Sequence, residues 1–134
     1  MIQVIKWTEA YATGIAEIDK QHKMFFRIVE DFRLSHVEGR GATVYEQVVN
    51  LLAAYARGHF GYEESCMHAH NCPMAANNKL EHTQFLRFIE RTREQYRLHG
   101  YRDHESEELL GTLEDWLTNH IGKVDVHLRD CVSK

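Results

Sequence analysis

Apolar residues recur every three or four positions along most of the chain, which is the spacing of one buried face of an α-helix. This pattern predicts four helices, from about residue 19 to 36, from 43 to 67–69, from 75–77 to a polar turn at 98–103, and from 104–106 to about 120. Helices with short loops and one apolar stripe each are typical of an up-down-up-down bundle. We therefore predict an all-α four-helix bundle.

Local signals refine the ends of these helices. Asp19 is expected to cap the first helix, and Thr43 followed by Glu46 has the pattern of a capping box at the start of the second. Residues 1–19 are expected to form an extended N-terminal arm that bends at a glycine and packs aromatic side chains on the bundle. Residues 124–134 are expected to form another short turn or helix.

Composition narrows the classes of function. The 134 residues are 43% hydrophobic and 27% charged, the balance of one globular domain spanning 1–134. A net charge of -4 argues against a nucleic-acid binder, which would usually show a basic face. No apolar run approaches the roughly 18 residues of a membrane span, and the first residues lack a signal-peptide pattern, so a cytoplasmic location is the default expectation.

The cysteines do not fit a disulfide framework, because there are three of them. We expect free thiols, with Cys131 an ordinary one, although Cys66 and Cys72 are candidates for a redox-active disulfide. The run of Cys66, His68, His70 and Cys72 is also a candidate for zinc, but its spacing differs from the usual structural zinc patterns. We expect most of these side chains to lie at the surface.

Polar residues interrupt the apolar stripes of all four predicted helices. They are His22 in the first, His59 and Glu63 in the second, Asn78 and His82 in the third, and His120 in the fourth. In an antiparallel bundle, the beginnings of the first and third helices lie at the same end as the ends of the second and fourth. The imidazoles and at least one carboxylate are therefore expected to meet inside one end of the core.

Metal coordination explains such a cluster better than separate hydrogen bonds do. Each buried polar group without a partner costs about 1–3 kcal/mol, and a metal ion satisfies several of them at once. His59 and Glu63 are four residues apart and so point the same way on a helix. Asp125 lies five residues after His120, about 140° away on an unbroken helix, but Gly122 between them is expected to let the chain turn so that Asp125 reaches the site.

The types of ligand indicate the metal and the number of ions. Imidazole and carboxylate ligands suit iron, with zinc and manganese as alternatives. The combination of two carboxylates with four histidines indicates two metal ions bridged by Glu63 and Asp125. The remaining histidines would each serve one ion.

Longer motifs extend this pattern across nearly the whole chain. They are Trp7, Thr13-Gly14-Ile15, Ile18-Asp19-Lys20-Gln21-His22-Lys23, His59-Phe60, Glu63-Glu64, Met67, Pro73, Glu81-His82 and Trp116-Leu117-Thr118-Asn119-His120-Ile121 with Asp125. Together these motifs resemble the hemerythrin family, which shares the four-helix bundle architecture. The resemblance implies a non-haem centre of two irons that binds O2 reversibly, with Glu63 and Asp125 bridging the irons together with an oxo or hydroxo group. The aromatic residues expected in the core, some of them walling the O2 pocket, are Phe25, Phe26, Tyr55, Tyr62 and Trp116.

The terminal ligands implied by the resemblance are histidines. His22 and His59 would hold the iron that keeps a position open for O2. His82 and His120 would hold the other iron. The family pattern expects one more histidine four residues before His82, where this chain has Asn78. Three outcomes are open there: the Asn78 amide oxygen binds weakly, a water or hydroxide fills the position, or the position stays open.

The departure at Asn78 changes the expected function. Each outcome weakens one donor, so reversible O2 storage is in doubt, and redox sensing or rapid oxidation by O2 becomes more plausible. A histidine of the loop before the third helix, His68 or His70, is a further candidate to replace the expected ligand.

We expect an O2-binding or O2- and redox-sensing protein rather than an enzyme, with O2, small anions or peroxide as ligands. Its length suits a free protein and a sensor module coupled to a signalling output domain equally. The alternatives are a di-iron enzyme of the peroxidase or oxidase type, and iron storage.

Overall fold

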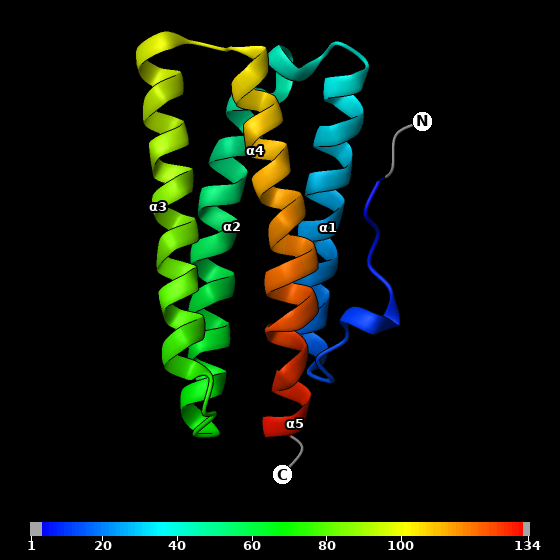
Figure 1. Ribbon diagram of the computed structural model, residues 1–134, viewed down its shortest axis with the longest axis vertical. Helices are drawn as coiled ribbons and strands as arrows, with labels where there is room; N and C mark the ends of the chain where they lie inside the picture. The colour runs from blue at the N-terminus through cyan, green and yellow to red at the C-terminus, as the bar shows by residue number, and fades with distance from the viewer. Residues whose placement is uncertain (1–3, 133–134) are drawn as a thin grey trace.

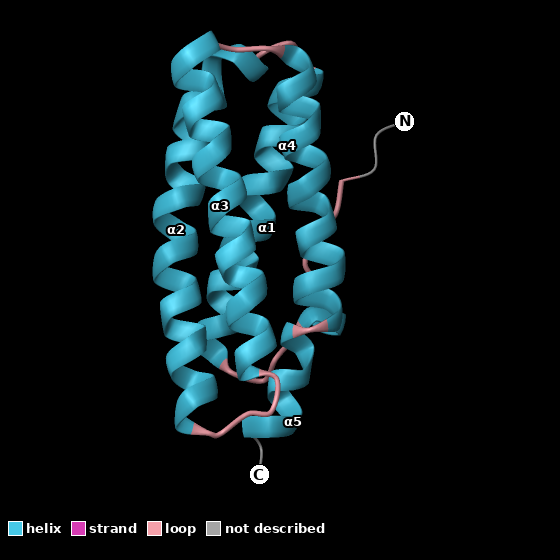
Figure 2. Cartoon of the chain, turned by 60° about the vertical axis from the view of Figure 1, so that its left-hand side comes forward, coloured by secondary structure: helices cyan, strands magenta, loops and turns pink. Residues whose placement is uncertain are grey.

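The computed structural model describes residues 4–132, and this part of the chain is helical without a strand (Figures 1 and 2). Four long helices run alternately up and down: α1 (Ala16–Val37), α2 (Gly41–Ala69), α3 (Ala75–His99) and α4 (Asp103–Asp115). The predicted all-α bundle is confirmed. The fourth helix differs most from its prediction, because its α-helical part ends early.

Short elements precede and follow the bundle. A 3-10 turn, η1 (Glu9–Tyr11), comes before α1. After α4 the chain continues as a π-helix, η2 (Trp116–Ile121), a 3-10 turn, η3 (Asp125–His127), and a short helix, α5 (Leu128–Val132). The turn or helix predicted after residue 124 is confirmed up to residue 132, and its last two residues lie outside the described range.

The N-terminal arm packs on α1. The ring of Tyr11 lies 4.7 Å from that of Phe26, and Nζ of Lys23 lies 4.4 Å from the centre of the Trp7 ring. Gly14 has a φ of +83°, a left-handed value that glycine adopts without strain, so the predicted bend is confirmed. The first three residues of the predicted arm lie outside the described range.

The starts of α1 and α2 differ from the predicted caps. α2 begins at Gly41, and no side chain caps it, so the capping box predicted for Thr43 and Glu46 was wrong. Asp19 lies inside the first turn of α1 and does not cap it. Its Oδ1 instead accepts hydrogen bonds from the backbone N–H and the hydroxyl of Thr13, each 2.8 Å long. Asp19 therefore ties the arm to α1.

The predicted apolar stripes form the core. The buried face of α1 and its counterparts on the other helices include Phe25, Phe26, Val29, Phe32, Val49, Leu52, Ala56, Phe60, Phe85, Ile89, Leu109, Leu113 and Leu117. Each large apolar side chain buried in this way contributes about 1.5–3 kcal/mol to stability. Tyr62, predicted in the core, is 44% exposed, because it precedes the buried Glu63 and so lies about 100° around the helix from it.

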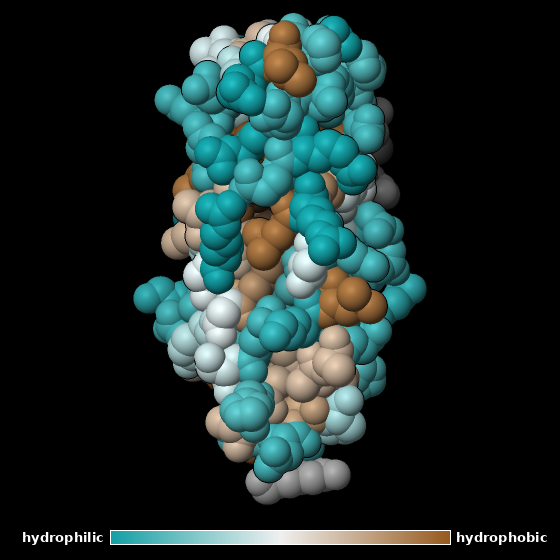
Figure 3. Space-filling view, turned by 90° about the vertical axis from the view of Figure 1, so that its left-hand side faces the viewer, coloured by the Kyte–Doolittle hydropathy of each residue, from teal (hydrophilic) through white to brown (hydrophobic). Residues whose placement is uncertain are grey.

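The outer surface is mainly polar. On α3, Arg93 pairs with Glu90 at 3.3 Å and Arg97 pairs with Glu94 at 2.6 Å. Figure 3 shows that this side of the bundle is mostly hydrophilic, with smaller apolar areas between the charged side chains. No helix within residues 4–132 is long and apolar enough to cross a membrane.

The prediction of three free thiols was wrong. Cys72 and Cys131 form a disulfide with their Cα atoms 5.7 Å apart, and Cys66 is the free cysteine. The alternative pairing of Cys66 with Cys72 is contradicted as well. The bonded residues are 59 positions apart in the sequence, so only the fold brings the α2–α3 loop and α5 together.

Candidate metal centre

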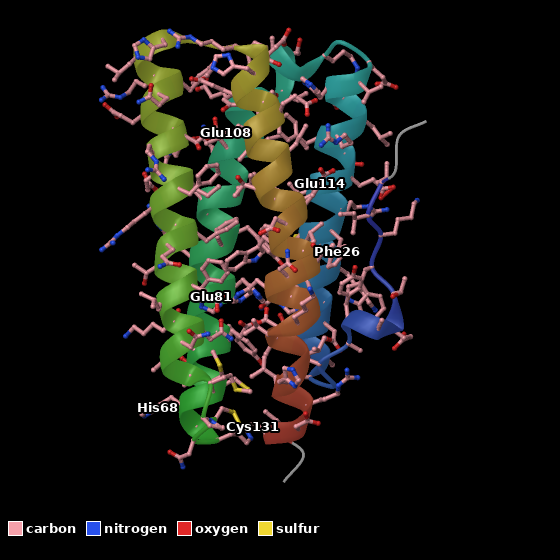
Figure 4. All side chains as sticks on the ribbon, in the orientation of Figure 1. Phe26, His68, Glu81, Glu108, Glu114 and Cys131 are labelled. Carbon is pink, nitrogen blue, oxygen red and sulfur yellow. A yellow bond between two sulfur atoms is a disulfide. The ribbon has the colours of Figure 1, made fainter. Side chains whose placement is uncertain are left out.

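Polar side chains from α1, α2, α3 and the segment that continues α4 converge in the interior of the bundle, near the level of Glu81 in Figure 4. They are His22 of α1, His59 and Glu63 of α2, His82 of α3, His120 of η2 and Asp125 of η3. None of these six side chains belongs to a residue more than 5% exposed. These six side chains are the ones that the sequence predicted as ligands of the two-ion cluster, and the structure brings them together.

Glu63 divides its carboxylate between two sets of histidines. Its Oε2 lies 3.3 Å from Nε2 of His22 and 3.2 Å from Nε2 of His59. Its Oε1 lies 3.1 Å from Nε2 of His82. One carboxylate therefore faces two neighbouring positions, one at each oxygen.

Asp125 repeats this arrangement. Its Oδ2 lies 3.2 Å from Nε2 of His22, and its Oδ1 lies 3.2 Å from Nε2 of His120. The ligand atoms form two groups of four residues, each within 4.8 Å, and both groups contain Glu63 and Asp125. The geometry is therefore that of two adjacent positions that share two carboxylates.

The cluster leaves many of its own polar atoms without a partner. Nε2 of His22, His82 and His120 makes no hydrogen bond within the described residues, and neither do Oε2 of Glu63 and Oδ2 of Asp125. Ligands about 2.1 Å from one ion and at right angles to one another lie about 3.0 Å apart, which is close to the nitrogen–oxygen separations above. The imidazole and carboxylate donors therefore fit a pair of metal ions.

The far ring nitrogens of two histidines are fixed by carboxylates. Nδ1 of His82 donates to Oε2 of Glu64, and Nδ1 of His120 donates to Oε1 of Glu81, both at 2.8 Å. A charged carboxylate only accepts hydrogen bonds, so the proton sits on Nδ1 of each ring. Nε2 then keeps its lone pair and faces the cluster, as a metal ligand must.

A third histidine is held by an amide. Oε1 of Gln21 lies 2.6 Å from Nδ1 of His59 and can accept its hydrogen bond. Gln21, like the two carboxylates, adjoins a cluster residue in sequence and holds a histidine of the next helix. Nδ1 of His22 is buried and has no such partner among residues 4–132. Gln21, Glu64 and Glu81 belong to the motifs that resemble the family, but the sequence did not predict that they hold histidines.

Charges within the cluster shift the protonation of the ion-free protein. Burial lowers the pKa of His22, but Asp125 and Glu63 outweigh it and raise this pKa to about 9. Burial raises the pKa of Glu63, but the neighbouring imidazoles, that of His22 first, hold it well below its usual value. In the ion-free cluster, His22 is therefore a positively charged imidazolium at neutral pH. The uptake of metal ions must release its extra proton.

The helix that carries His120 is irregular up to Asp125. His120 lies in the π-helix η2, which ends at Ile121, and Asp125 begins the 3-10 turn η3. His120 and Asp125 are therefore not joined by one unbroken α-helix, and the angle of about 140° expected between them on such a helix does not apply. The prediction that Gly122 makes this turn was wrong, because its φ of -72° is ordinary for a right-handed helix. Gly122 instead makes room for Tyr11, whose Cε1 would lie 3.1 Å from an added Cβ.

Asn78 is buried beside the second group of ligands, with 0% exposure. Its Nδ2 donates to Oδ1 of Asp125 at 3.1 Å and lies 3.5 Å from Oε1 of Glu63. Its Oδ1 has no hydrogen-bond partner in the described part of the chain. The amide therefore contacts, on both carboxylates, the oxygen that faces the second group.

The alternative metal ligands near the α2–α3 loop are not assembled. His68 and His70 are exposed, and Figure 4 shows His68 at the periphery of the bundle, so neither replaces a histidine at Asn78. Cys72 is bonded to Cys131, and the metal-type groups within residues 4–132 contain no residue of the run from Cys66 to Cys72. The alternative zinc site is therefore contradicted.

Comparison with known proteins identifies the family of this bundle. The Hemerythrin HHE cation binding domain matches residues 13–128, which is most of the chain. The chain belongs to the hemerythrin family. It is thus a hemerythrin-like non-haem iron domain, and the buried cluster is where the family's metal would lie.

Individual relatives of the hemerythrin family agree with this assignment. Bacteriohemerythrin of Pseudomonas paraeruginosa is 32% identical over 128 residues, covering 94% of this chain and 80% of the relative. Bacteriohemerythrin of Methylococcus capsulatus is 27% identical, and the match covers 97% of this chain and 98% of the relative. A crystal structure of wild-type hemerythrin, 24% identical, matches with a TM-score of 0.82 over 98% of this chain and 100% of that chain, which confirms the fold.

Proposed function

We propose that the protein holds two irons in its two ligand groups and binds O2 there, as an O2- or redox-responsive protein. The observation that carries this proposal is that two buried groups of histidines share Glu63 and Asp125. These carboxylates would bridge the irons together with an oxo or hydroxo group. The bacteriohemerythrin relatives support the proposal by family.

The remaining ligands divide between the two irons. His22 and His59 would hold one iron, on the side of the cluster away from Asn78. His82 and His120 would hold the other. Asn78 stands beside this second iron, where its amide replaces the imidazole that the family pattern expects.

The protein side chains create the conditions for O2 binding. The irons, when bound, would supply the binding position for O2 and the electrons that O2 takes up. Glu64 and Glu81 keep the protons of their histidines on Nδ1, so that Nε2 stays free to bind. The low exposure of the six ligand residues keeps bulk water out and favours small ligands such as O2, small anions or peroxide.

Asn78 favours sensing over storage. An amide is a weaker donor than an imidazole, and the Nδ2 of Asn78 is engaged by Asp125 at 3.1 Å. The second iron would therefore be less firmly held in its reduced state and more open to exchange and oxidation. A sensor of this kind acts through a signalling output domain, either fused to it or separate.

The same feature supports a second candidate function. An exchangeable position beside Asn78 would also suit the turnover of peroxide by a peroxidase- or oxidase-type enzyme. Steady consumption of peroxide in the presence of a reductant would favour this candidate. Iron storage, the third candidate, requires uptake of more irons than the two ligand groups hold.

Metal analysis and mixing with O2 test the proposal. The purified protein should contain two irons per chain, and one iron or zinc would contradict it. The reduced protein is then mixed with O2 and followed by absorption. Immediate oxidation of the irons is the expected result for a sensor, while a long-lived oxygenated form would favour O2 carriage.

We further propose that residues 1–134 form one domain and that the protein is cytoplasmic. The family match over residues 13–128 and the single bundle support the first proposal. Cell fractionation tests the second, since recovery outside the cytoplasmic fraction would contradict it.

A further inference from the structure

The Cys72–Cys131 disulfide closes the end of the bundle nearest the metal centre. Cys72 lies in the α2–α3 loop and Cys131 in α5, and Figure 4 shows Cys131 beside sulfur atoms at the lower end of the molecule. The bridge therefore joins the last described helix to the body of the bundle.

The segment that this bridge holds also carries Asp125. Asp125 begins η3, and α5 with Cys131 follows directly. Val126 and Leu128 are the buried apolar side chains of the segment. Outside regular helices, its backbone hydrogen bonds are local, from N of Val124 to O of His120 and from N of His127 to O of Val124. The disulfide is the covalent long-range anchor of the segment, beside the contacts of Asp125 with Asn78 and His22.

The Leu128 side chain shows how closely the bridge and the segment are packed together. Leu128 is fully buried and belongs to a small apolar cluster apart from the main core, whose other buried members are Ile18, Met67 and Cys72. This small cluster touches the same α5 turn that the disulfide holds. After loss of the bridge, the nearest buried anchor of Asp125 in α5 would be Leu128, which lies three positions further along the chain.

The two sulfur atoms differ in their access to solvent. Cys72 is 5% exposed, whereas Cys131 is only partly buried and its Sγ lies 3.8 Å from the backbone oxygen of the exposed His70. Of the two residues, Cys131 is therefore the one more open to a dissolved thiolate. Disulfides that form in the cytoplasm, the location proposed above, are usually transient and act in catalysis or redox sensing.

We propose that the Cys72–Cys131 disulfide is a thiol-exchange site, through which a dithiol reductant frees the Asp125 segment and weakens the hold of the metal centre on its ions. The effect on metal ions rests on the proposed function, whereas the effect on the segment does not. The substrate class is a dithiol, which supplies in one molecule the two thiols and the two electrons that complete reduction needs.

The chemical steps balance without any other reactant. One thiolate of the reductant attacks Sγ of Cys131, the sulfur–sulfur bond breaks, and Cys72 leaves as a thiolate that takes a proton. The second thiol of the reductant loses its proton and attacks the other sulfur of the reductant, which is bonded to Cys131 in the mixed disulfide. Cys131 is released and protonated, and the reductant leaves as a disulfide.

Cys66 provides a matched control for the experiment. It packs against the same small apolar cluster and is partly buried, but it is not bonded to either partner. Alkylation followed by mass spectrometry should label this one thiol in the oxidised protein, and all three cysteines after reduction with dithiothreitol.

Hydrogen exchange of the ion-free protein tests the effect on the segment. Amides of residues 124–132 should exchange at least about tenfold faster after reduction, while amides in the middle of α1 and α2 keep their rates. The Cys72→Ser/Cys131→Ser variant should exchange fast with or without dithiothreitol, and Cys66→Ser should behave as the wild type. If reduction left the hydrogen exchange of residues 124–132 unchanged, the disulfide would have no control over the segment, and the proposal would be overturned.

Iron release tests the effect on the metal centre. Iron-loaded protein is mixed with an excess of chelator, and reduction of the wild type should speed the loss of iron about tenfold or more. The double serine variant should lose iron fast in either condition, which excludes a direct action of dithiothreitol on iron. Equal rates in all samples would overturn the coupling, while protein that binds no iron would contradict the proposed function and leave the exchange result standing.

Discussion

Glu81 of α3 accepts a hydrogen bond of 2.8 Å from Nδ1 of His120, which lies in η2, the continuation of α4. Glu64 of α2 does the same for His82 of α3. Each of these carboxylates directly adjoins one cluster residue in the sequence and orients a histidine of the cluster that comes from a different helix. This arrangement predicts that the outer carboxylates control metal binding although they do not belong to the cluster.

The variant Glu81→Ala is expected to weaken iron binding about 10- to 100-fold. The ring of His120 would lose the acceptor that keeps its proton on Nδ1, so Nε2 would no longer be held free for a metal. Competition with a chelator of known affinity measures the change. Glu81→Gln should lose less, because the amide oxygen still accepts a hydrogen bond.

Glu94→Ala is the control for this comparison. It removes the same charge from the same helix, but the Glu94 carboxylate is 49% exposed and pairs with Arg97. Equal losses in Glu81→Ala and Glu94→Ala would mean that net charge, and not the orientation of His120, sets the affinity.

The buried cluster could be predicted because its residues break a regular pattern. His22, His59 and His82 occupy positions on stripes that are otherwise apolar, and periodicity identifies such positions without a structure. The antiparallel order of four helices then places them at one end. The prediction of Asp125 also required a turn of the chain after His120. Asp125 does reach the cluster, but Gly122 is not the cause of the turn.

The outer partners could not be found by the same reasoning. Gln21, Glu64 and Glu81 lie one position from a stripe, about 100° around the helix, where polar residues usually face solvent. Their role depends on which helix lies beside them. The one feature of the sequence that could have indicated them is that each directly adjoins a cluster residue.

The disulfide and the π-helix were missed for different reasons. Cys72 and Cys131 are 59 residues apart, so their pairing depends on the whole fold. The η2 segment has no local signature, since Trp116 to Ile121 continue the helical spacing of α4. The segment departs from α-helical geometry at the point where His120 and Asp125 must face the same cluster.

The ion-free protein is expected to lose stability as the pH rises from about 6.5 to 9. Burial lowers the pKa of His22, but Asp125 and Glu63 raise it to about 9, against an unfolded value near 6.5. Between these values the folded state binds more protons than the unfolded state, so the free energy of unfolding falls, by on the order of 2–3 kcal/mol. Urea unfolding at pH 6.5, 7.5 and 9 measures the fall.

Two histidine variants test the origin of this pH dependence. His22→Gln should reduce it. His127→Gln should preserve it, because the His127 side chain is 61% exposed and lies outside the cluster. A stability that stays level across the window in the ion-free wild type would contradict the prediction.

Two glycines of α2 are expected to respond differently to alanine. A Cβ at Gly58 would meet nothing within 4 Å, so Gly58→Ala should stabilise the protein by about 0.5–1 kcal/mol through its higher helix propensity. A Cβ at Gly41 would lie 2.7 Å from Oη of Tyr101, so Gly41→Ala should lose this gain or destabilise the protein. Thermal unfolding of both variants measures the difference, and equal stabilisation would show that Tyr101 moves aside without cost.

Asn78→His is expected to slow the loss of iron to a chelator and to lengthen the life of the oxygenated form. It exchanges an amide for an imidazole beside Asp125, where Nδ2 of Asn78 now lies 3.1 Å from Oδ1, and so gives the second iron a stronger donor. Rapid mixing of the reduced protein with O2, followed by absorption, measures the lifetime. Asn50→His is the control, because Asn50 is an exposed residue of α2 and the variant adds a histidine away from the cluster. If Asn78→His matched the wild type in both measurements, a water or another group would already complete the second iron, and the departure at Asn78 would not explain a sensing function.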